Sequence, residues 1–201
     1  MTESLGRIET IAGPVVKCSG LPSVRMYEVV RVGNQQLIGE VIEVGDEEFT
    51  AQVYEETSGL APGEPVASTC DSLSVELGPG LLGAIYDGIQ RPLPKLQQMS
   101  GDFISRGLNV EGLDKEKKWT FTPTIKVGAK VSPGDIIGEV PETGIITSKI
   151  MVPVGVQGEV VEIASKGEFT VIETICKVKD EHGDIHDIVM LQRTPVRIGR
   201  T

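Results

Sequence analysis

QLIGEVIEVGDEEFTAQVYEE, from Gln36 to Glu56, carries the pattern that decides the fold of this chain. Phe49, Ala51 and Val53 alternate with polar residues, and a period of two is typical of a strand with one buried face. The Val44-Gly45-Asp46 step before them supplies residues that tolerate positive φ, as a tight hairpin requires. The stretch therefore predicts two antiparallel strands that share a core.

Similar short runs rich in Val, Ile and Thr extend on both sides of this hairpin, from Gly6 to about Leu77. They are separated by Gly, Pro, Asn and Asp at intervals of roughly 8 to 12 residues, a spacing typical of a small closed sheet. A second tight turn is expected at Val32-Gly33-Asn34. The chain is thus predicted to be mainly β, and residues 1–75 are predicted to form a six-stranded β-barrel.

The pattern changes between Gly78 and Gly112, where three prolines interrupt any strand. The one helix expected here is short, around Leu96–Ile104. We interpret residues 76–114 as a connector, or as part of a domain whose remainder lies elsewhere.

From about Lys117 the β pattern returns and continues to Arg197. KVSPGDIIGEV (Lys130 to Val140) and EIASKGEFTVIE (Glu162 to Glu173) each place a glycine and an acidic residue just before an apolar strand. This internal echo resembles the barrel-sandwich arrangement of lipoyl- and biotinyl-type modules, in which two hairpin halves bury a common core. A second β-rich, barrel-sandwich-like module is predicted.

Composition excludes several functional classes. No apolar stretch reaches the roughly 18 to 20 residues of a membrane span, and the N-terminus has no apolar signal region, so a cytoplasmic protein without direct membrane insertion is expected. Three well-separated cysteines fit a reducing compartment. The net charge of -10 argues against nucleic acid as a partner.

Gly78, Gly80 and Gly83 spell the G-x-G-x-x-G pattern of dinucleotide sites, in which the glycines open a helix. Pro79 removes one N–H donor, and AIYDGIQRPLP after the pattern cannot sustain a helix. We therefore interpret the pattern as a structural turn. No G-x-x-x-x-G-K-[ST] phosphate loop occurs in the chain.

Lys149 is expected where a modified lysine would lie on a hairpin tip. Carrier modules surround that lysine with characteristic neighbours, whereas Ser148 and Ile150 flank Lys149 here. A free-standing lipoyl- or biotinyl-like carrier or binding module is the alternative function.

His182 and His186 lie four residues apart in KVKDEHGDIHDIVML, which predicts a strand, a turn and a strand. At about 3.3 Å per residue, this spacing along a strand separates the rings by more than roughly 10 Å. No metal site is expected, and no catalytic or cofactor-binding residue can be assigned.

Several segments together resemble the catalytic A subunit of archaeal-type (A-type or V-type) rotary ATPases. The ELGPGLLGAIYDGIQRPL block, from Glu76 to Leu93, is highly specific for that family. Thr194 replaces the family's usual Trp. The supporting segments occur in family order and are GPVVK (Gly13 to Lys17), IGEVIEV (Ile38 to Val44), QVYEETSGLAPGEPV (Gln52 to Val66) and TPVR (Thr194 to Arg197).

The resemblance implies a layout in which residues 1–75 are the N-terminal barrel, which joins other barrels in a ring. Residues 76–114 begin the nucleotide-binding domain, 115–190 are the inserted non-homologous region, and 191–201 are a return strand toward the rest of that domain. The family's phosphate loop, catalytic glutamate and adenine pocket would all follow Thr201. The parent subunit is then an enzyme that uses Mg-ATP, whereas this piece is expected to hold no cofactor and to be inactive.

The same resemblance implies partners: the B subunit of the head and the peripheral stalk, in a complex on the inner face of the cell membrane. The charged hairpin around Gly183 is the candidate docking surface. Its residues are Lys177, Lys179, Asp180, Glu181, Asp184 and Asp187.

Overall fold

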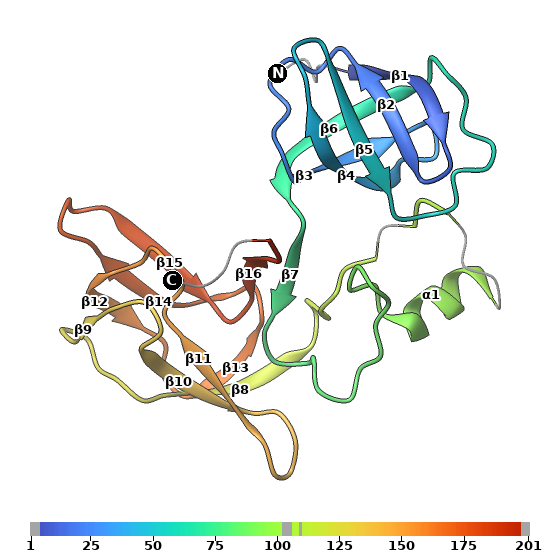
Figure 1. Ribbon diagram of the computed structural model, residues 1–201. Coiled ribbons are helices and arrows are strands. Elements are labelled where there is room, and N and C mark those ends of the chain that lie inside the picture. Colours follow the sequence, from blue (N-terminus) through green and yellow to red (C-terminus); the bar gives the residue numbers. More distant parts are fainter. Residues whose placement is uncertain (1–4, 102–105, 109, 198–201) are drawn as a thin grey trace.

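The computed structural model describes residues 5–101, 106–108 and 110–197. It consists of two β units, joined by a connector that contains the helix α1 (Figure 1). Among the described residues, no helix has both the length and the apolar character needed to cross a bilayer.

The first unit is a closed barrel of six antiparallel strands, as predicted, and the structure gives their order as β1-β2-β5-β4-β3-β6. The pairing of β1 with β6 closes the sheet and leaves no free edge. The strands are β1 (Leu5–Ala12), β2 (Val15–Ser19), β3 (Glu28–Val32), β4 (Leu37–Val44), β5 (Glu48–Val53) and β6 (Pro65–Ser72).

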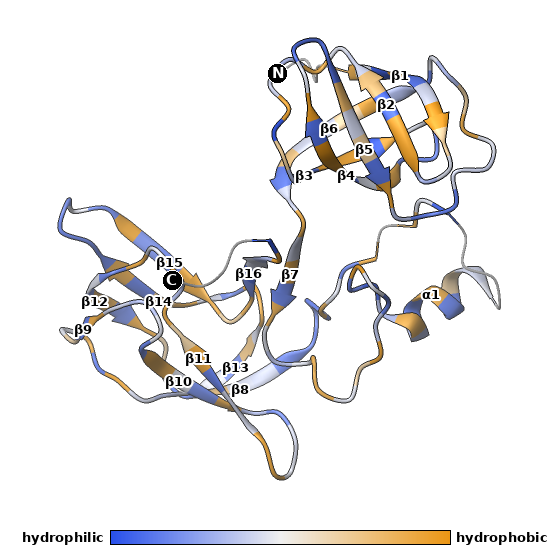
Figure 2. Ribbon diagram, in the orientation of Figure 1, coloured by the Kyte–Doolittle hydropathy of each residue, from blue (hydrophilic) through white to orange (hydrophobic). Residues whose placement is uncertain are grey.

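The alternation in β5 fills the barrel. Phe49, Ala51 and Val53 are 2%, 0% and 3% exposed and belong to one apolar core. Apolar and polar residues alternate along the barrel strands in Figure 2. Because burying a Val or Phe side chain contributes roughly 1.5–3 kcal/mol, this pattern fixes which face of each strand points inward.

Both expected hairpin turns are present, between β3 and β4 and between β4 and β5. Gly33 has a φ of 75° and Gln36 a φ of 55°. A Cβ on Gly33 would lie 2.3 Å from Leu60 Cδ2, so both the backbone and the packing require glycine at this turn.

The chain leaves the barrel through β7 (Ser74–Leu77), which pairs antiparallel with β16 (Gln192–Pro195). The helix α1 (Leu93–Ser100) starts three residues earlier than expected, because Pro92 and Pro94 favour a helix start. It ends at Ser100 and is capped by Gly101, which has a φ of 71°. Residues 102–104 of the predicted helix lie outside the described residues.

The second unit contains two four-stranded sheets, ordered β11-β10-β8-β13 and β15-β14-β12-β9. The first half of its sequence contributes β8 to β11, and the second half contributes β12 to β15. The strands are β8 (Lys118–Pro123), β9 (Lys130–Val131), β10 (Ile136–Pro141), β11 (Thr147–Met151), β12 (Gly158–Ile163), β13 (Gly167–Thr170), β14 (Thr174–Lys179) and β15 (Ile185–Val189).

The two sheets have equivalent topologies, and each half places its short second strand, β9 or β13, in the sheet of the other half. The structure therefore contains an internal repeat, but the sequence comparison paired segments that are not equivalent in it. The turn Ser132–Asp135 corresponds to Thr170–Glu173, not to the glycine turn before β13. In each of the two turns the final acid accepts the first N–H, at 2.8 Å for Asp135 and 2.5 Å for Glu173.

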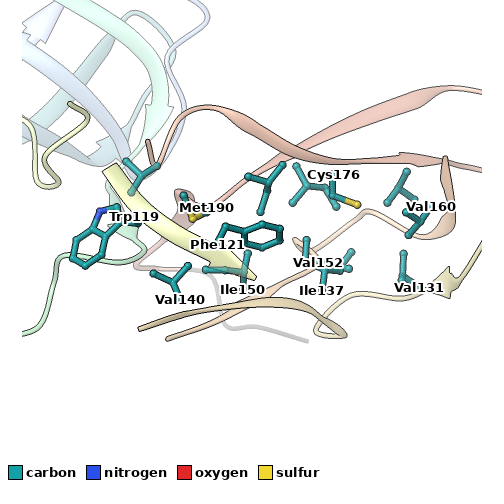
Figure 3. Close-up of a cluster of buried hydrophobic side chains, with 14 residues drawn as sticks. Trp119, Phe121, Val131, Ile137, Val140, Ile150, Val152, Val160, Cys176 and Met190 are labelled. Carbon is teal, nitrogen blue, oxygen red and sulfur yellow. The ribbon is translucent and has the colours of Figure 1, made fainter. Parts of the chain in front are cut away.

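Both sheets bury one common core (Figure 3). Phe121, Ile137 and Val140 enter it from one sheet, and Val160 and Val178 enter it from the other. All five residues are fully buried, with an exposed fraction of 0%. The barrel and the second unit thus have separate cores.

Candidate functional site

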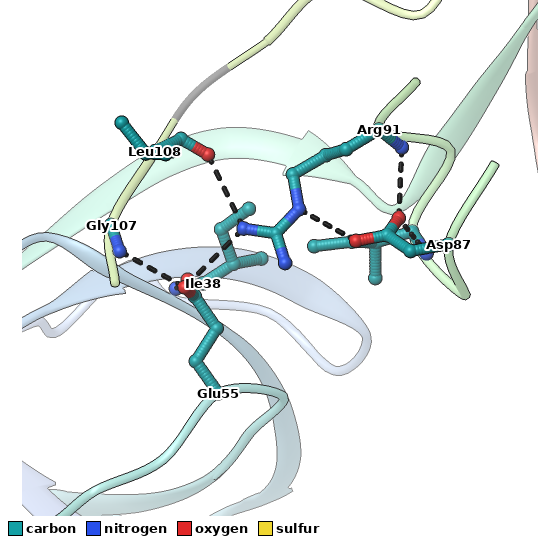
Figure 4. A network of polar contacts seen from close by, with 7 residues as sticks. Ile38, Glu55, Asp87, Arg91, Gly107 and Leu108 are labelled. Carbon is teal, nitrogen blue, oxygen red and sulfur yellow. Dashed lines mark hydrogen bonds and ion pairs between the residues drawn. The ribbon is translucent and has the colours of Figure 1, made fainter. Parts of the chain in front are cut away.

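Arg91 of the connector joins two acidic residues from different parts of the chain, and its side chain is only 10% exposed. Its Nε donates to Asp87 Oδ2 at 2.7 Å, and its Nη1 donates to Glu55 Oε2 at 3.3 Å and to the Leu108 carbonyl at 3.3 Å (Figure 4). Glu55 follows barrel strand β5, so the guanidinium holds the connector against the barrel. Arg91 is the cation that pairs with both of these largely buried carboxylates, and Glu55 also accepts the N–H groups of Ile38 and Gly107, at 3.2 and 2.9 Å.

Asp87 organises the loop before Arg91 by accepting the N–H groups of Ile89 and Arg91 at 3.1 and 2.8 Å. Burial raises the pKa of Asp87, but the hydrogen bonds from Arg91 and Ile89 outweigh it and hold that pKa below its usual range. Next to Arg91, the Gln90 side-chain amide pairs with the backbone of Glu76 in β7 at 2.6 and 2.7 Å. The DGIQR sequence is thus an architectural clamp.

Glu40 is a second buried anchor, 1% exposed on the outer side of β4. It accepts from Arg197 Nη2 at 2.6 Å and Nε at 3.2 Å, and from the Tyr54 hydroxyl at 2.8 Å. The Arg197 hydrogen bonds hold the pKa of Glu40 below its usual range despite burial. Because Arg197 follows β16, this ion pair ties the end of the second unit back to the barrel.

Sequence reasoning missed both anchors. The available signals were Glu40, an acid inside the otherwise apolar IGEVIEV run, and Arg91 within the specific connector block. Their partners lie 157 and 36 residues away in sequence, and only the fold brings them together.

The glycine loop Gly78–Gly83 is a turn, as predicted, and the next helix begins only at Leu93. The N–H groups of Gly80 and Leu82 both donate to Glu142 Oε1, at 2.8 and 3.0 Å. The anion held by this glycine loop is therefore a carboxylate from the β10–β11 hairpin.

The placement expected for Lys149 was wrong. Lys149 lies in the middle of β11, paired with Glu139 of β10, and the hairpin tip is at residues 142–146. A carrier lysine needs a tip from which its arm can swing, so the structure gives the carrier alternative no support.

His182 and His186 lie on the β14–β15 hairpin, His182 in its turn and His186 on β15. His186 Nε2 is 2.8 Å from Asp180 Oδ2, and this hydrogen bond holds the pKa of Asp180 below its usual range. Asp180 also accepts the N–H groups of His182 and Asp184, each at 2.9 Å. In the described part of the chain, no three His, Cys, Asp or Glu residues are arranged to hold a metal ion.

The six candidate docking residues all lie on this hairpin, but they differ in how far they are already engaged. Lys177 pairs with Glu162 at 2.7 Å and faces Asp187 across the strands. Asp180 is used inside the turn, as described above. Lys179, Glu181, Asp184 and Asp187 are exposed and form the outer surface of the hairpin.

Two of the three cysteines, Cys18 and Cys176, are buried. Burial raises the pKa of Cys18 to about 12 and that of Cys176 to about 11, so both thiols stay protonated at neutral pH.

Comparison with known protein families matches both β units. Residues 8–69 match the β-barrel domain of the ATP synthase alpha/beta family, and residues 110–197 match the barrel-sandwich domain of the ATP synthase alpha/beta subunit. The chain belongs to the ATP synthase alpha/beta family. These matches, together with the relatives described next, confirm the resemblance that was inferred from the sequence segments.

Individual relatives in this family are similar over nearly the whole chain. The chain is 57% identical to the A subunit of the A-type ATP synthase of Methanopyrus kandleri over 192 residues, which cover 96% of this chain and 32% of the relative. The corresponding A subunits of Pyrococcus abyssi and Thermococcus kodakarensis are each 57% identical, over 97% and 98% of this chain. Those matches cover 19% and 34% of the two relatives, so the chain spans about a third of their length or less.

Proposed function

We propose that this chain is the N-terminal part of the catalytic A subunit of a rotary ATPase that couples ATP synthesis or hydrolysis to proton or sodium transport. The proposal rests on one observation: a closed barrel and a barrel-sandwich unit on one chain, each matching this family, with 57% identity to the A subunit of an A-type ATP synthase. The role proposed for this part is ring assembly and stator docking.

The barrel supports the ring-assembly role because all its strands are paired within the sheet. A barrel without free edges meets its neighbours through side chains, so it can form a ring without uncontrolled strand pairing. The proposed neighbours are the B subunits of the head. The complex would lie in the cytoplasm, on the inner face of the membrane.

Mg-ATP would bind to the parent subunit rather than to these residues. Phosphoryl transfer needs a phosphate-binding cradle, a lysine and magnesium ligands, and the sequence contains no G-x-x-x-x-G-K-[ST]. We expect the 201-residue chain to bind Mg-ATP no more tightly than millimolar and to hydrolyse none. A micromolar, stoichiometric isotherm in calorimetry would contradict this assignment.

Stator docking is proposed for the β14–β15 hairpin because its exposed charges remain available to a partner. Of the six candidate residues, Lys179, Glu181, Asp184 and Asp187 would contact peripheral stalk subunits. Lys177 and Asp180 would act indirectly, by fixing the strands and the turn.

The test is binding of purified peripheral stalk subunits to the chain carrying Glu181→Lys and Asp184→Lys. The matched control carries Asp46→Lys and Glu47→Lys, two exposed acids at the β4–β5 hairpin tip of the barrel. We expect at least about tenfold weaker binding for the first variant and unchanged binding for the control. Equal binding by both variants would refute docking at this hairpin.

A further inference from the structure

Glu142 links the second unit to the glycine loop of the connector. Three observations indicate that this contact joins two parts of the molecule. The first is its geometry. One oxygen of Glu142 accepts the N–H groups of Gly80 and Leu82, and the other accepts the hydroxyl of Ser148 on β11. Burial raises the pKa of Glu142, but these hydrogen bonds outweigh burial and keep the carboxyl ionised.

The second ground is the internal repeat. Asp180 occupies the position in the β14–β15 hairpin that Glu142 occupies in β10–β11, and His186 occupies that of Ser148. Within the described residues, the hydrogen bonds of Asp180 all stay inside its own hairpin. A hairpin of this form therefore folds without reaching outside itself, so the bond from Glu142 to the loop serves to join two parts of the molecule.

The third ground is Trp119, which is 7% exposed. Its Nε1 has no hydrogen-bond partner. Among the described residues, no other buried side-chain nitrogen or oxygen lacks one. A Cβ on Gly80 would lie 3.3 Å from Trp119 Cζ2, so the loop backbone lies against the indole edge next to that nitrogen. Buried donors are normally paired, and an unpaired donor beside a loop is consistent with a second loop position in which a loop carbonyl accepts it.

The loop has the freedom to occupy another position. Gly80 and Gly83 have φ values of 110° and 79°, and glycine exchanges between such conformations at little cost. Leu82 in the loop and Ile85 just after it are 47% and 64% exposed, so little apolar contact holds the outer side of the loop.

From these observations we propose that Glu142 and the Gly78–Gly83 loop form a releasable latch between the barrel-sandwich unit and the connector. In the latched state, the carboxylate holds the N–H groups of Gly80 and Leu82. In the released state, a carbonyl of the loop moves onto Trp119 Nε1. A displacement of the β10–β11 hairpin would thereby be transmitted to the connector and to the barrel that Arg91 clamps.

The latch can be tested in the 201-residue chain by hydrogen exchange and NMR, because Trp119 is its single tryptophan. In Glu142→Ala, exchange of the Gly80 and Leu82 amides should rise at least about tenfold, and the Trp119 indole N–H resonance should move downfield as it gains an acceptor. Glu142→Gln should give a smaller change, because its amide oxygen still accepts. Asp180→Ala, the repeat-equivalent control, should leave Gly80, Leu82 and the indole unchanged.

Two outcomes would overturn the latch. One is retained protection of Gly80 and Leu82, or an unmoved indole resonance, in Glu142→Ala. The other is loss of protection at core residues Phe121 and Val160 in both Glu142→Ala and Glu142→Gln, because the contact would then be a requirement of the fold and not a joint.

Discussion

At the residue scale, Arg91 is the side chain on which the connector depends most. Its guanidinium compensates Asp87 and Glu55, whose side chains are 17% and 6% exposed. Removing a cation from such a site leaves buried charges unpaired, which costs more than the ion pairs themselves contribute.

We therefore expect Arg91→Ala to lower the free energy of unfolding by about 3 kcal/mol, and Arg91→Lys by about half as much, because a lysine keeps the charge but not the planar fork. Urea denaturation followed by circular dichroism measures both. As a control, Arg7→Ala, at an exposed position of β1 that forms no ion pair with the described residues, should change stability by less than about 0.5 kcal/mol. Equal effects of Arg91→Ala and Arg7→Ala would contradict the clamp.

Asp87 gives this clamp a defined pH dependence. Its folded-state pKa lies below the ordinary value of 3.8, so its contribution is fully present above about pH 4 and is lost as pH falls through the folded pKa. The stability difference between the native chain and Asp87→Asn should thus be constant from about pH 7 to pH 5 and shrink below pH 4. A difference that grows on acidification would mean that the carboxylate is not stabilised in the folded state.

Contacts between individual side chains were also the features that could be predicted least well from the sequence. Glu40 and Arg197 are ordinary charges in the sequence, and their pairing depends on the long-range β7–β16 pair, which brings Arg197 back to the barrel. Lys149 was misplaced for a related reason: its neighbours do not reveal that the β10–β11 turn closes three residues earlier. Isolated charged residues carry no periodicity from which a partner could be inferred.

At the scale of elements, the second unit shows how a repeat can persist in topology while its side chains diverge. Phe121 corresponds to Val160, and Gly138 corresponds to Cys176, by their places in the paired strands. A Cβ on Gly138 would lie 2.1 Å from Phe121 Cε2. One half therefore combines a large residue with a glycine, and the other combines two residues of intermediate size.

Gly138→Ala should accordingly lower the free energy of unfolding by about 2 kcal/mol, because the added methyl group overlaps the Phe121 ring. In the Phe121→Val background, the same substitution should cost at least about 1 kcal/mol less, since the ring is gone. Thermal or urea unfolding of the four chains gives the coupling. Strict additivity of the two substitutions would show that the ring and the glycine do not constrain each other.

Elements were predicted where the sequence has a clear period. The alternation in β5 and the regular turn spacing predicted the closed barrel, and the β-rich second unit was also predicted. The echo pointed to two halves but paired the wrong turns, because Ser132–Asp135 and Thr170–Glu173 share only a short Ser/Thr-x-x-Asp/Glu pattern and the second turn has no glycine. The exchange of β9 and β13 between sheets cannot be read from strands of two and four residues.

At the scale of the whole molecule, two separate cores are joined by a few polar links and by the β7–β16 pair. These links include Arg91 with Glu55, Arg197 with Glu40, and Glu142 with the glycine loop. Because polar links between units bury little apolar area, each unit must obtain most of its stability from its own core.

The second unit is therefore expected to fold when residues 110–191 are produced alone. This segment keeps both sheets and includes Leu113, which is 1% exposed and lies with Trp119 against Gly80. Its amide NMR spectrum should be dispersed, and removal of the glycine loop should shift Trp119 emission to longer wavelength by exposing the indole. The same segment carrying Phe121→Ala, which loses a fully buried ring at a cost of about 3–5 kcal/mol, should be partly or wholly unfolded. A collapsed, undispersed spectrum of the unsubstituted segment would mean that the barrel and the connector are needed for its fold, and that the polar links contribute far more than their buried area implies.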